Sequence, residues 1–111
     1  MNREIKKYKN YFDKFISKLE FNEAVKVLKA LDILKFRQEF TLKHFVKKIK
    51  SVKGVYELRT QYGNNEFRIF YIYENDKIIV LFNGIKKKNQ KLSKKELEKI
   101  KLIKKAYDKE K

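Results

Sequence analysis

The sequence contains no cysteine, no proline, three glycines and one histidine among its 111 residues. Without cysteine there is no disulfide scaffold, no thiolate nucleophile and no Cys-ligated zinc or iron–sulfur site. The single histidine, His44, cannot supply a histidine cluster for a metal, and an ordinary surface or boundary role is expected for it. With no proline and so few glycines, the chain has no linker, low-complexity tract or repeat. We therefore expect one domain over residues 1–111, with no metal and no cofactor.

Long apolar runs are also missing. No stretch is long enough to cross a bilayer, and the N-terminal sequence MNREIKKYKNYF lacks the apolar core of a signal peptide. Together with the absence of cysteine, these features predict a cytoplasmic protein that has no membrane partner.

Basic residues, in contrast, are abundant. Lys and Arg number 30 against 14 Asp and Glu, which gives a formal charge of +16. A field of this sign favours a polyanionic partner, although a lysine-rich surface that only solubilises the protein would have the same charge. Hydrophobic residues still make up 42% of the chain and recur with clear periodicity, so we expect a folded domain.

Three segments between residues 55 and 82 have the composition of strands. Residues 55–60, 67–73 and 78–82 are rich in β-branched and aromatic side chains. Residues 63–65 and 75–76, rich in Gly, Asn and Asp, separate them as tight turns. Two consecutive tight connections predict an antiparallel three-stranded meander, with Gly84 ending its third strand.

Helical periodicity occurs on both sides of this meander. One helix is expected over about residues 10–19, a second begins after an N-cap at Asn22, and a capping box at residues 93–96 opens a last helix. Residues 36–53 are less regular and suit a short helix or a loop, while residues 3–7 suit a short edge strand. The result is an α+β sandwich with the helices on one face of the sheet. The apolar stripes are Tyr8, Tyr11, Phe12, Phe15, Ile16 and Leu19, then Ala24, Val27, Leu28, Leu31 and Leu34, and finally Leu97, Ile100, Ile103 (or Lys104) and Tyr107.

Two arginines lie within the predicted strands. Arg59 and Arg68 are both out of phase with the apolar residues of their strands, so we expect them on the opposite side of the sheet, on neighbouring strands. Two adjacent guanidinium groups are costly unless an anion lies between them, and their planar forks can hold phosphate oxygens bidentately. The alternative is a pair of ordinary strand arginines that bridge Glu57 or Glu66.

A lysine cluster follows the third strand and supplies further candidates. These lysines would project from the rim of the sheet toward the arginines, where one of them could stabilise charge or transfer a proton. Lysine runs are also commonly solvated loops. Tyrosines of the middle strand are candidates for base stacking or proton transfer. The residues concerned are Lys86, Lys87, Lys88 and Lys91, with Tyr71 and Tyr73.

Four short motifs follow one another in this half of the chain: YELR (residues 56–59), FRIFY (67–71), KIIVLFNG (77–84) and KKNQK (87–91). In this order they resemble the RelE/HigB superfamily of toxins, and above all its phage-derived HigB-like branch, whose members show YELR, YRIFY-like, IVLLHGF and KKTQKTP segments. Upstream, YFDKFISKL and VLKALDIL are similar to the first two helices of that branch.

The resemblance implies a toxin of a type II toxin–antitoxin system that cleaves mRNA on the ribosome. In the implied reaction the ribose 2′-OH attacks the adjacent phosphate without a metal, and a helix-turn-helix, HigA-like antitoxin inhibits the toxin in a hetero-oligomer. Carried over residue by residue, the catalytic set is Arg59, Arg68, Lys87 and Lys88, with Lys91 as the last lysine of the KKTQK match.

The chain departs from this pattern where the branch has a histidine. Asn83 stands at that position, Asn89 replaces a threonine, and Leu92-Ser93 replaces Thr-Pro, which leaves the acid/base group of the implied reaction unassigned. A non-catalytic RNA- or DNA-binding module of the same fold is therefore an alternative function. A third class is a domain that binds anionic membranes or proteins through its lysine-rich final helix.

Overall fold

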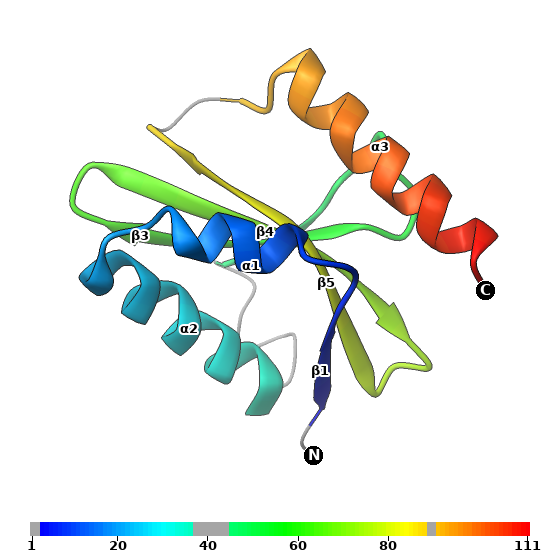
Figure 1. Ribbon diagram of the computed structural model, residues 1–111, viewed down its shortest axis with the longest axis horizontal. Coiled ribbons are helices and arrows are strands. Elements are labelled where there is room, and N and C mark those ends of the chain that lie inside the picture. The colour runs from blue at the N-terminus through cyan, green and yellow to red at the C-terminus, as the bar shows by residue number, and fades with distance from the viewer. Residues whose placement is uncertain (1–2, 37–44, 89–90) are drawn as a thin grey trace.

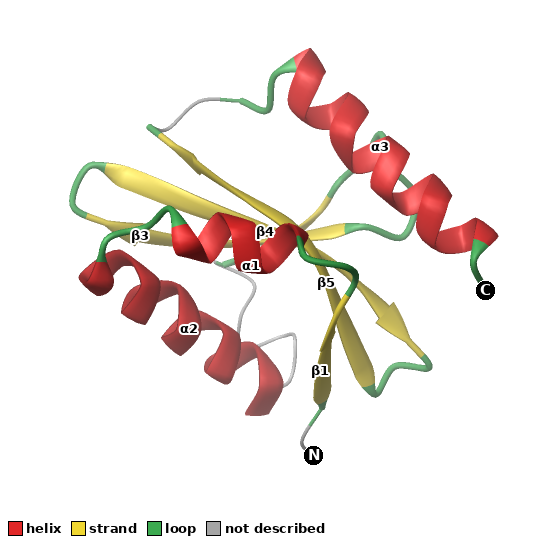
Figure 2. Cartoon of the chain, in the orientation of Figure 1, coloured by secondary structure: helices red, strands yellow, loops and turns green. Residues whose placement is uncertain are grey.

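A computed structural model describes residues 3–36, 45–88 and 91–111. Within these ranges three helices accompany one five-stranded sheet with the spatial order β1-β5-β4-β3-β2 (Figures 1 and 2). The elements in chain order are β1 (Glu4–Lys7), α1 (Tyr11–Ser17), α2 (Phe21–Phe36), β2 (Val46–Lys48), β3 (Tyr56–Tyr62), β4 (Asn65–Glu74), β5 (Ile78–Lys87) and α3 (Lys94–Lys109).

The predicted meander forms the centre of this sheet. Strands β3, β4 and β5 pair antiparallel in succession, and the expected edge strand β1 pairs parallel with β5. Asn75 and Asp76 both have positive φ in the β4–β5 turn, as the central residues of a type I′ turn do, and the Lys77 N–H donates to the Glu74 carbonyl.

The sheet is nevertheless larger than predicted, because a further edge strand pairs with β3. Strand β2 lies within the segment for which a short helix or a loop was expected, and residues 37–44 of that segment lie outside the described residues. Strand β5 also continues past Gly84, where the sequence predicted its end, and reaches Lys87.

The helices lie on both faces of the sheet, which corrects the prediction of a single covered face. Helices α1 and α2 pack on what we call the α1–α2 face, and α3 packs on the opposite α3 face. The reason lies in the middle of β4, where both sets of alternating side chains include large apolar residues that must be covered. The α1–α2 face buries Phe67, Ile69 and Tyr71 of this strand, and the α3 face buries Phe70 and Ile72.

The helix ends follow the predicted capping chemistry only in part. At α3, Ser93 and Glu96 form the full capping box. Helix α2 instead starts one residue before Asn22, where the Glu23 carboxylate accepts a hydrogen bond of 3.0 Å from the Glu20 backbone N–H. Leu28, expected in the buried stripe of α2, is 48% exposed.

Candidate functional site

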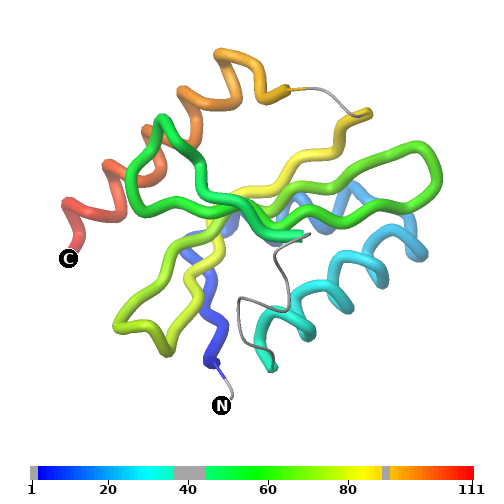
Figure 3. The backbone as a smooth tube through the Cα atoms, turned by 180° about the vertical axis from the view of Figure 1, so that it is seen from behind, coloured from blue at the N-terminus to red at the C-terminus, as the bar shows by residue number. Residues whose placement is uncertain are grey.

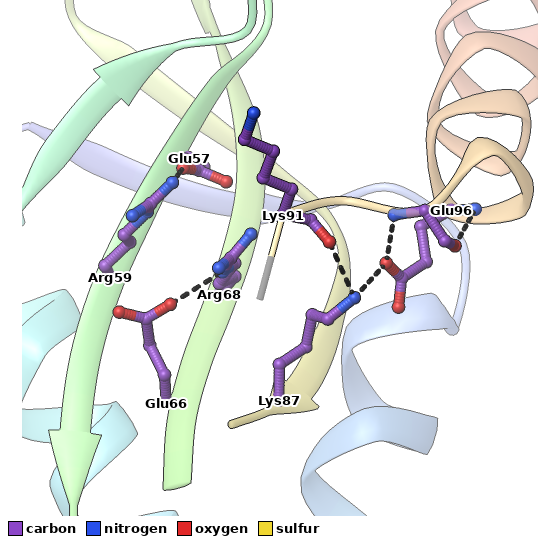
Figure 4. A network of polar contacts seen from close by, with 8 residues as sticks. Glu57, Arg59, Glu66, Arg68, Lys87, Lys91 and Glu96 are labelled. Atoms are coloured by element: carbon purple, nitrogen blue, oxygen red, sulfur yellow. Dashed lines mark hydrogen bonds and ion pairs between the residues drawn. The ribbon is translucent and has the colours of Figure 1, made fainter. Parts of the chain in front are cut away.

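Three cations lie side by side on the α3 face, beyond the N-terminal end of α3 (Figure 4). Arg59 on β3 pairs directly with Arg68 on β4, so the two side chains share one face. Lys87 on β5 pairs with Glu66, which lies two residues before Arg68 and therefore has the same orientation. We call Arg59, Arg68 and Lys87 the cation row. It crosses three neighbouring strands.

A one-residue irregularity in β5 decides which lysine joins this row. Ile69 pairs with Gly84 but Tyr71 pairs with Leu81, so β5 contains one extra residue between these positions. Such an insertion reverses the alternation of side chains beyond it. Lys87 consequently faces the arginines. In a strand without this extra residue, Lys86 would face them instead.

Each cation of the row has a carboxylate partner. The Arg59 guanidinium lies 2.5 Å from Glu57 Oε1, and the Nε of Arg68 donates to Glu66 Oε1 at 2.7 Å. These two pairs are the strand-surface bridges that the sequence offered as the alternative to phosphate binding. They mean that any incoming phosphate must compete with built-in carboxylates.

Lys87 is held from the other side by the start of α3. Its Nζ donates to Glu96 Oε1 at 2.7 Å and to the Lys91 backbone carbonyl at 3.0 Å (Figure 4). Burial alone would raise the pKa of Glu96, but hydrogen bonds from Lys87 and from Ser93 outweigh it and lower this pKa below its ordinary value. Glu96 is therefore ionised at neutral pH and anchors the lysine.

The row is most accessible at its β3 end. The Arg59 side chain is 30% exposed, whereas those of Lys87 and Arg68 are 10% and 3% exposed. Glu57 is buried, and no group among the described residues donates a hydrogen bond to its second oxygen. Arg59 can therefore meet a ligand directly, while Arg68 contributes mainly through its charge at short range.

The remaining predicted lysines are dispersed. Lys86 faces α2, where its Nζ contacts the buried Glu23 carboxylate at 2.8 Å. The hydrogen bonds from Lys86 and from the Glu20 backbone lower the pKa of Glu23. Lys88 is exposed just after β5, and the side chain of Lys91 points away from the row (Figure 4).

The two predicted tyrosines lie on the α1–α2 face, across the sheet from the arginines. Tyr71 is fully buried, and its ring stacks on Tyr56 with a centroid separation of 5.6 Å. Tyr73 packs edge-on against both rings. The structure thus brings together Arg59, Arg68 and Lys87 but not Tyr71 or Tyr73.

Two residues near the row were not assigned by sequence. Glu96 was read only as part of a capping box, although the short connection from β5 to α3 was a signal that it could reach the last residues of β5. Asn83, which stands where the resemblance led us to expect histidine, is buried in β5, and its Oδ1 accepts no hydrogen bond within the described part of the chain.

Other kinds of site are not apparent in residues 3–36, 45–88 and 91–111. No group of three or more His, Asp or Glu side chains gathers there as a metal site would require, and His44 lies outside these ranges. No helix of the described chain is long and apolar enough to cross a membrane.

The sheet order and the layers define a RelE-like α+β fold. Among eight matching chains of solved structures is one from "Crystal structure of archaeal RelE-RelB complex from Pyrococcus horikoshii OT3", with a TM-score of 0.57, 22% identity and coverage of 82% of this chain and 100% of that chain. The family model "Phage derived protein Gp49-like (DUF891)" matches residues 14–105. The chain therefore belongs to this phage-derived Gp49-like family. A comparison with curated proteins finds no match.

Proposed function

We propose that this chain is the toxin of a type II toxin–antitoxin system and an endoribonuclease that cleaves mRNA on the ribosome. Membership of the Gp49-like family and the RelE-like fold support the toxin class. The observation that carries the nuclease assignment is the cation row, because three cations on adjacent strands can stabilise the negative charge that grows on a phosphodiester in its transition state. We further propose that the chain belongs to the HigB-like branch of the RelE/HigB superfamily and that it acts in the cytoplasm.

In the proposed reaction the ribose 2′-OH loses its proton to solvent, and its oxygen forms a bond to phosphorus while the bond from phosphorus to the 5′-oxygen breaks. The products are a 2′,3′-cyclic phosphate and a 5′-hydroxyl. Arg59 binds a non-bridging phosphate oxygen through its exposed guanidinium. Arg68, which is buried beside it, stabilises the negative charge that the phosphate gains in the transition state. Lys87 lies nearest the start of α3 and protonates or neutralises the leaving 5′-oxygen. Lys88 and Lys91 hold flanking phosphates, and no cofactor takes part.

A second function, a non-catalytic RNA- or DNA-binding module, is favoured by two features of the same face. Each cation already has a carboxylate partner, and Asn83 supplies no ionisable group where the resemblance implies a histidine. Such a module would keep its affinity for nucleic acid but would leave the transcript intact.

The partners follow from the same proposal. The cognate antitoxin is a small helix-turn-helix, HigA-like protein that forms a hetero-oligomer with this chain and blocks its access to the ribosome. The formal charge of +16 favours an acidic binding segment in that antitoxin. Co-expression of the product of a neighbouring gene should restore growth, and failure of every adjacent small protein to do so would contradict this part.

The test is induced expression in bacteria, with growth followed and transcript 5′ ends mapped. Arg68→Ala is a poor probe by itself, because breaking a buried ion pair costs about 3–5 kcal/mol of stability. Arg68→Lys keeps the charge beside Glu66 but removes the planar fork, and Lys14→Gln on the exposed part of α1 is the matched control.

We expect growth arrest and new 5′ ends with the wild type and the control, and neither with a folded Arg68→Lys protein. A reporter message without a start codon should remain uncut. Soluble, folded wild type that leaves all transcripts intact would refute the nuclease proposal and favour the binding module.

A further inference from the structure

A second basic surface lies along the second half of α3, at the opposite end of this helix from the cation row. An open groove of about 740 Å³ runs between the loop before β3 and the second half of α3. We call it the lysine groove. Its lining residues are Ser51, Val52, Lys53, Gly54, Lys101, Lys104, Lys105, Asp108 and Lys109.

The groove has fixed walls, because its two sides share one core. Val52 and Val55 of the loop are buried in the same cluster as Ile100 and Ile103 of α3, and the loop lies beside the helix in both views (Figures 1 and 3). Gly54 has a φ of +83°, and the position of a Cβ there would lie 3.6 Å from Cε of Lys104. The loop and the helix that form the two sides of the groove are therefore held together by packing.

The charge of the lysine groove is not neutralised as that of the cation row is. Its one carboxylate, Asp108, is occupied by Lys104 at 2.6 Å. Lys53, Lys105 and Lys109 are exposed and have no ion-pair partner within the described part of the chain. Three cations from two different elements thus line a hollow whose one carboxylate is already paired with another lysine.

We propose that the lysine groove binds the phosphate backbone of a folded RNA. Lysines act as point charges on phosphate and carry no sequence information, which suits backbone contacts. A protein partner is less well matched, since protein interfaces are depleted in lysine and enriched in aromatic residues and arginine, and the groove contains neither.

The groove and the cation row are connected by α3. This helix starts beside Lys87 at Glu96 and reaches the groove at Lys105, about 13 Å further along its axis. One large RNA can therefore contact both surfaces. The identification of ribosomal RNA as the natural ligand of the groove rests on the proposed function. The binding of an RNA backbone by the groove does not depend on that function.

The experiment compares two triple variants that lower the formal charge of +16 by the same amount. Lys53→Gln, Lys105→Gln and Lys109→Gln together remove the unpaired lysines of the groove. The control combines Lys14→Gln, Lys18→Gln and Lys29→Gln, which are exposed on α1, its C-cap and α2. All six positions are exposed, and thermal unfolding checks that both variants fold. The probe is a short labelled RNA duplex of mixed sequence, titrated at several salt concentrations.

We expect the groove triple to bind the duplex about tenfold more weakly at low salt, with a salt slope reduced by about two to three, and the control to change little. Equal losses in both triples would show that only total charge matters and would overturn the proposal. Unchanged duplex affinity with lost affinity for polyglutamate would assign the groove to an acidic protein instead. Because binding alone is measured, a chain that cleaves no message can still pass this test.

Discussion

Replacing Gly84 by alanine should destabilise the protein through a single contact. A Cβ at this position would lie 2.4, 2.6 and 2.7 Å from three ring atoms of Phe15, about 1 Å inside ordinary contact distance. Strand β4 holds Gly84 opposite Ile69, and the Phe15 ring is buried in the α1–α2 core, so neither side yields freely. Overpacking of this kind costs about 1–3 kcal/mol, from which about 0.5–1 kcal/mol is recovered because alanine is better than glycine in a strand.

The middle of these ranges gives a net loss of about 1 kcal/mol, which lowers Tm by roughly 4–8 °C in a domain of this size. Thermal and urea unfolding of the single variants and of Gly84→Ala with Phe15→Leu will measure it. The double variant should recover at least about 0.5 kcal/mol relative to additivity, because the smaller side chain removes the clash. Gly63→Ala is the matched control: it meets no atom but has a φ of +63°, so its loss should persist with Phe15→Leu. Strictly additive effects, or a Gly84→Ala protein as stable as wild type, would refute the reasoning.

Three further predictions concern the charged groups. Lys87→Met should reduce the cleavage rate by about 10²–10³-fold, as loss of one transition-state donor does. Lys86→Met should leave the cleavage rate unchanged but lower stability, because it leaves the buried Glu23 carboxylate without its lysine partner. Equal losses of cleavage rate in the two variants would contradict the faces assigned to these lysines. Folding lowers the pKa of Glu96, so the ionised Glu96 stabilises the protein fully at pH values above its ordinary pKa of 4.5, and this stabilisation is lost as the pH falls below 4.5. The free energy of unfolding of Glu96→Gln, measured in urea, should therefore depend less on pH below 4.5 than that of the wild type. Glu66→Gln should tighten binding of single-stranded RNA severalfold, measured by fluorescence anisotropy, because it removes one carboxylate beside the cation row and so raises the local positive charge by one. Weaker binding would show that the carboxylate positions its arginine for RNA.

The juxtaposition of the two arginines was predictable because its causes are local. Strand composition located β3 and β4, and a tight turn containing Gly63 fixed their register, with Tyr62 paired to Asn65. Once that register is set, Arg59 must lie opposite Arg68. The capping box of α3 was equally local, since it depends on residues three apart.

The arrangement around the arginines was less predictable because it depends on distant parts of the chain. The apolar character of Phe70 and Ile72, which share the phase of Arg68, was the overlooked sign that α3 covers the same face. The choice of Lys87 over Lys86 depends on one inserted residue in β5 next to Gly84, a glycine that the sequence alone predicts to be the end of the strand. Strand β2 is only three residues long, too short to show an alternating pattern.

The parallel pairing of β1 with β5 has a consequence for how the chain is made. Glu4 pairs with Ile78, so β1 has no partner until the more than 70 residues between these two positions have been synthesised. Contacts of such long sequence separation form late, after the β3–β5 meander has closed over shorter loops. Lys87 and Glu96 belong to the same late part of the chain. A polypeptide whose synthesis stops before β5 therefore has neither β1 in place nor a cation row, and the charged face is complete only after β5 and the start of α3 have been made.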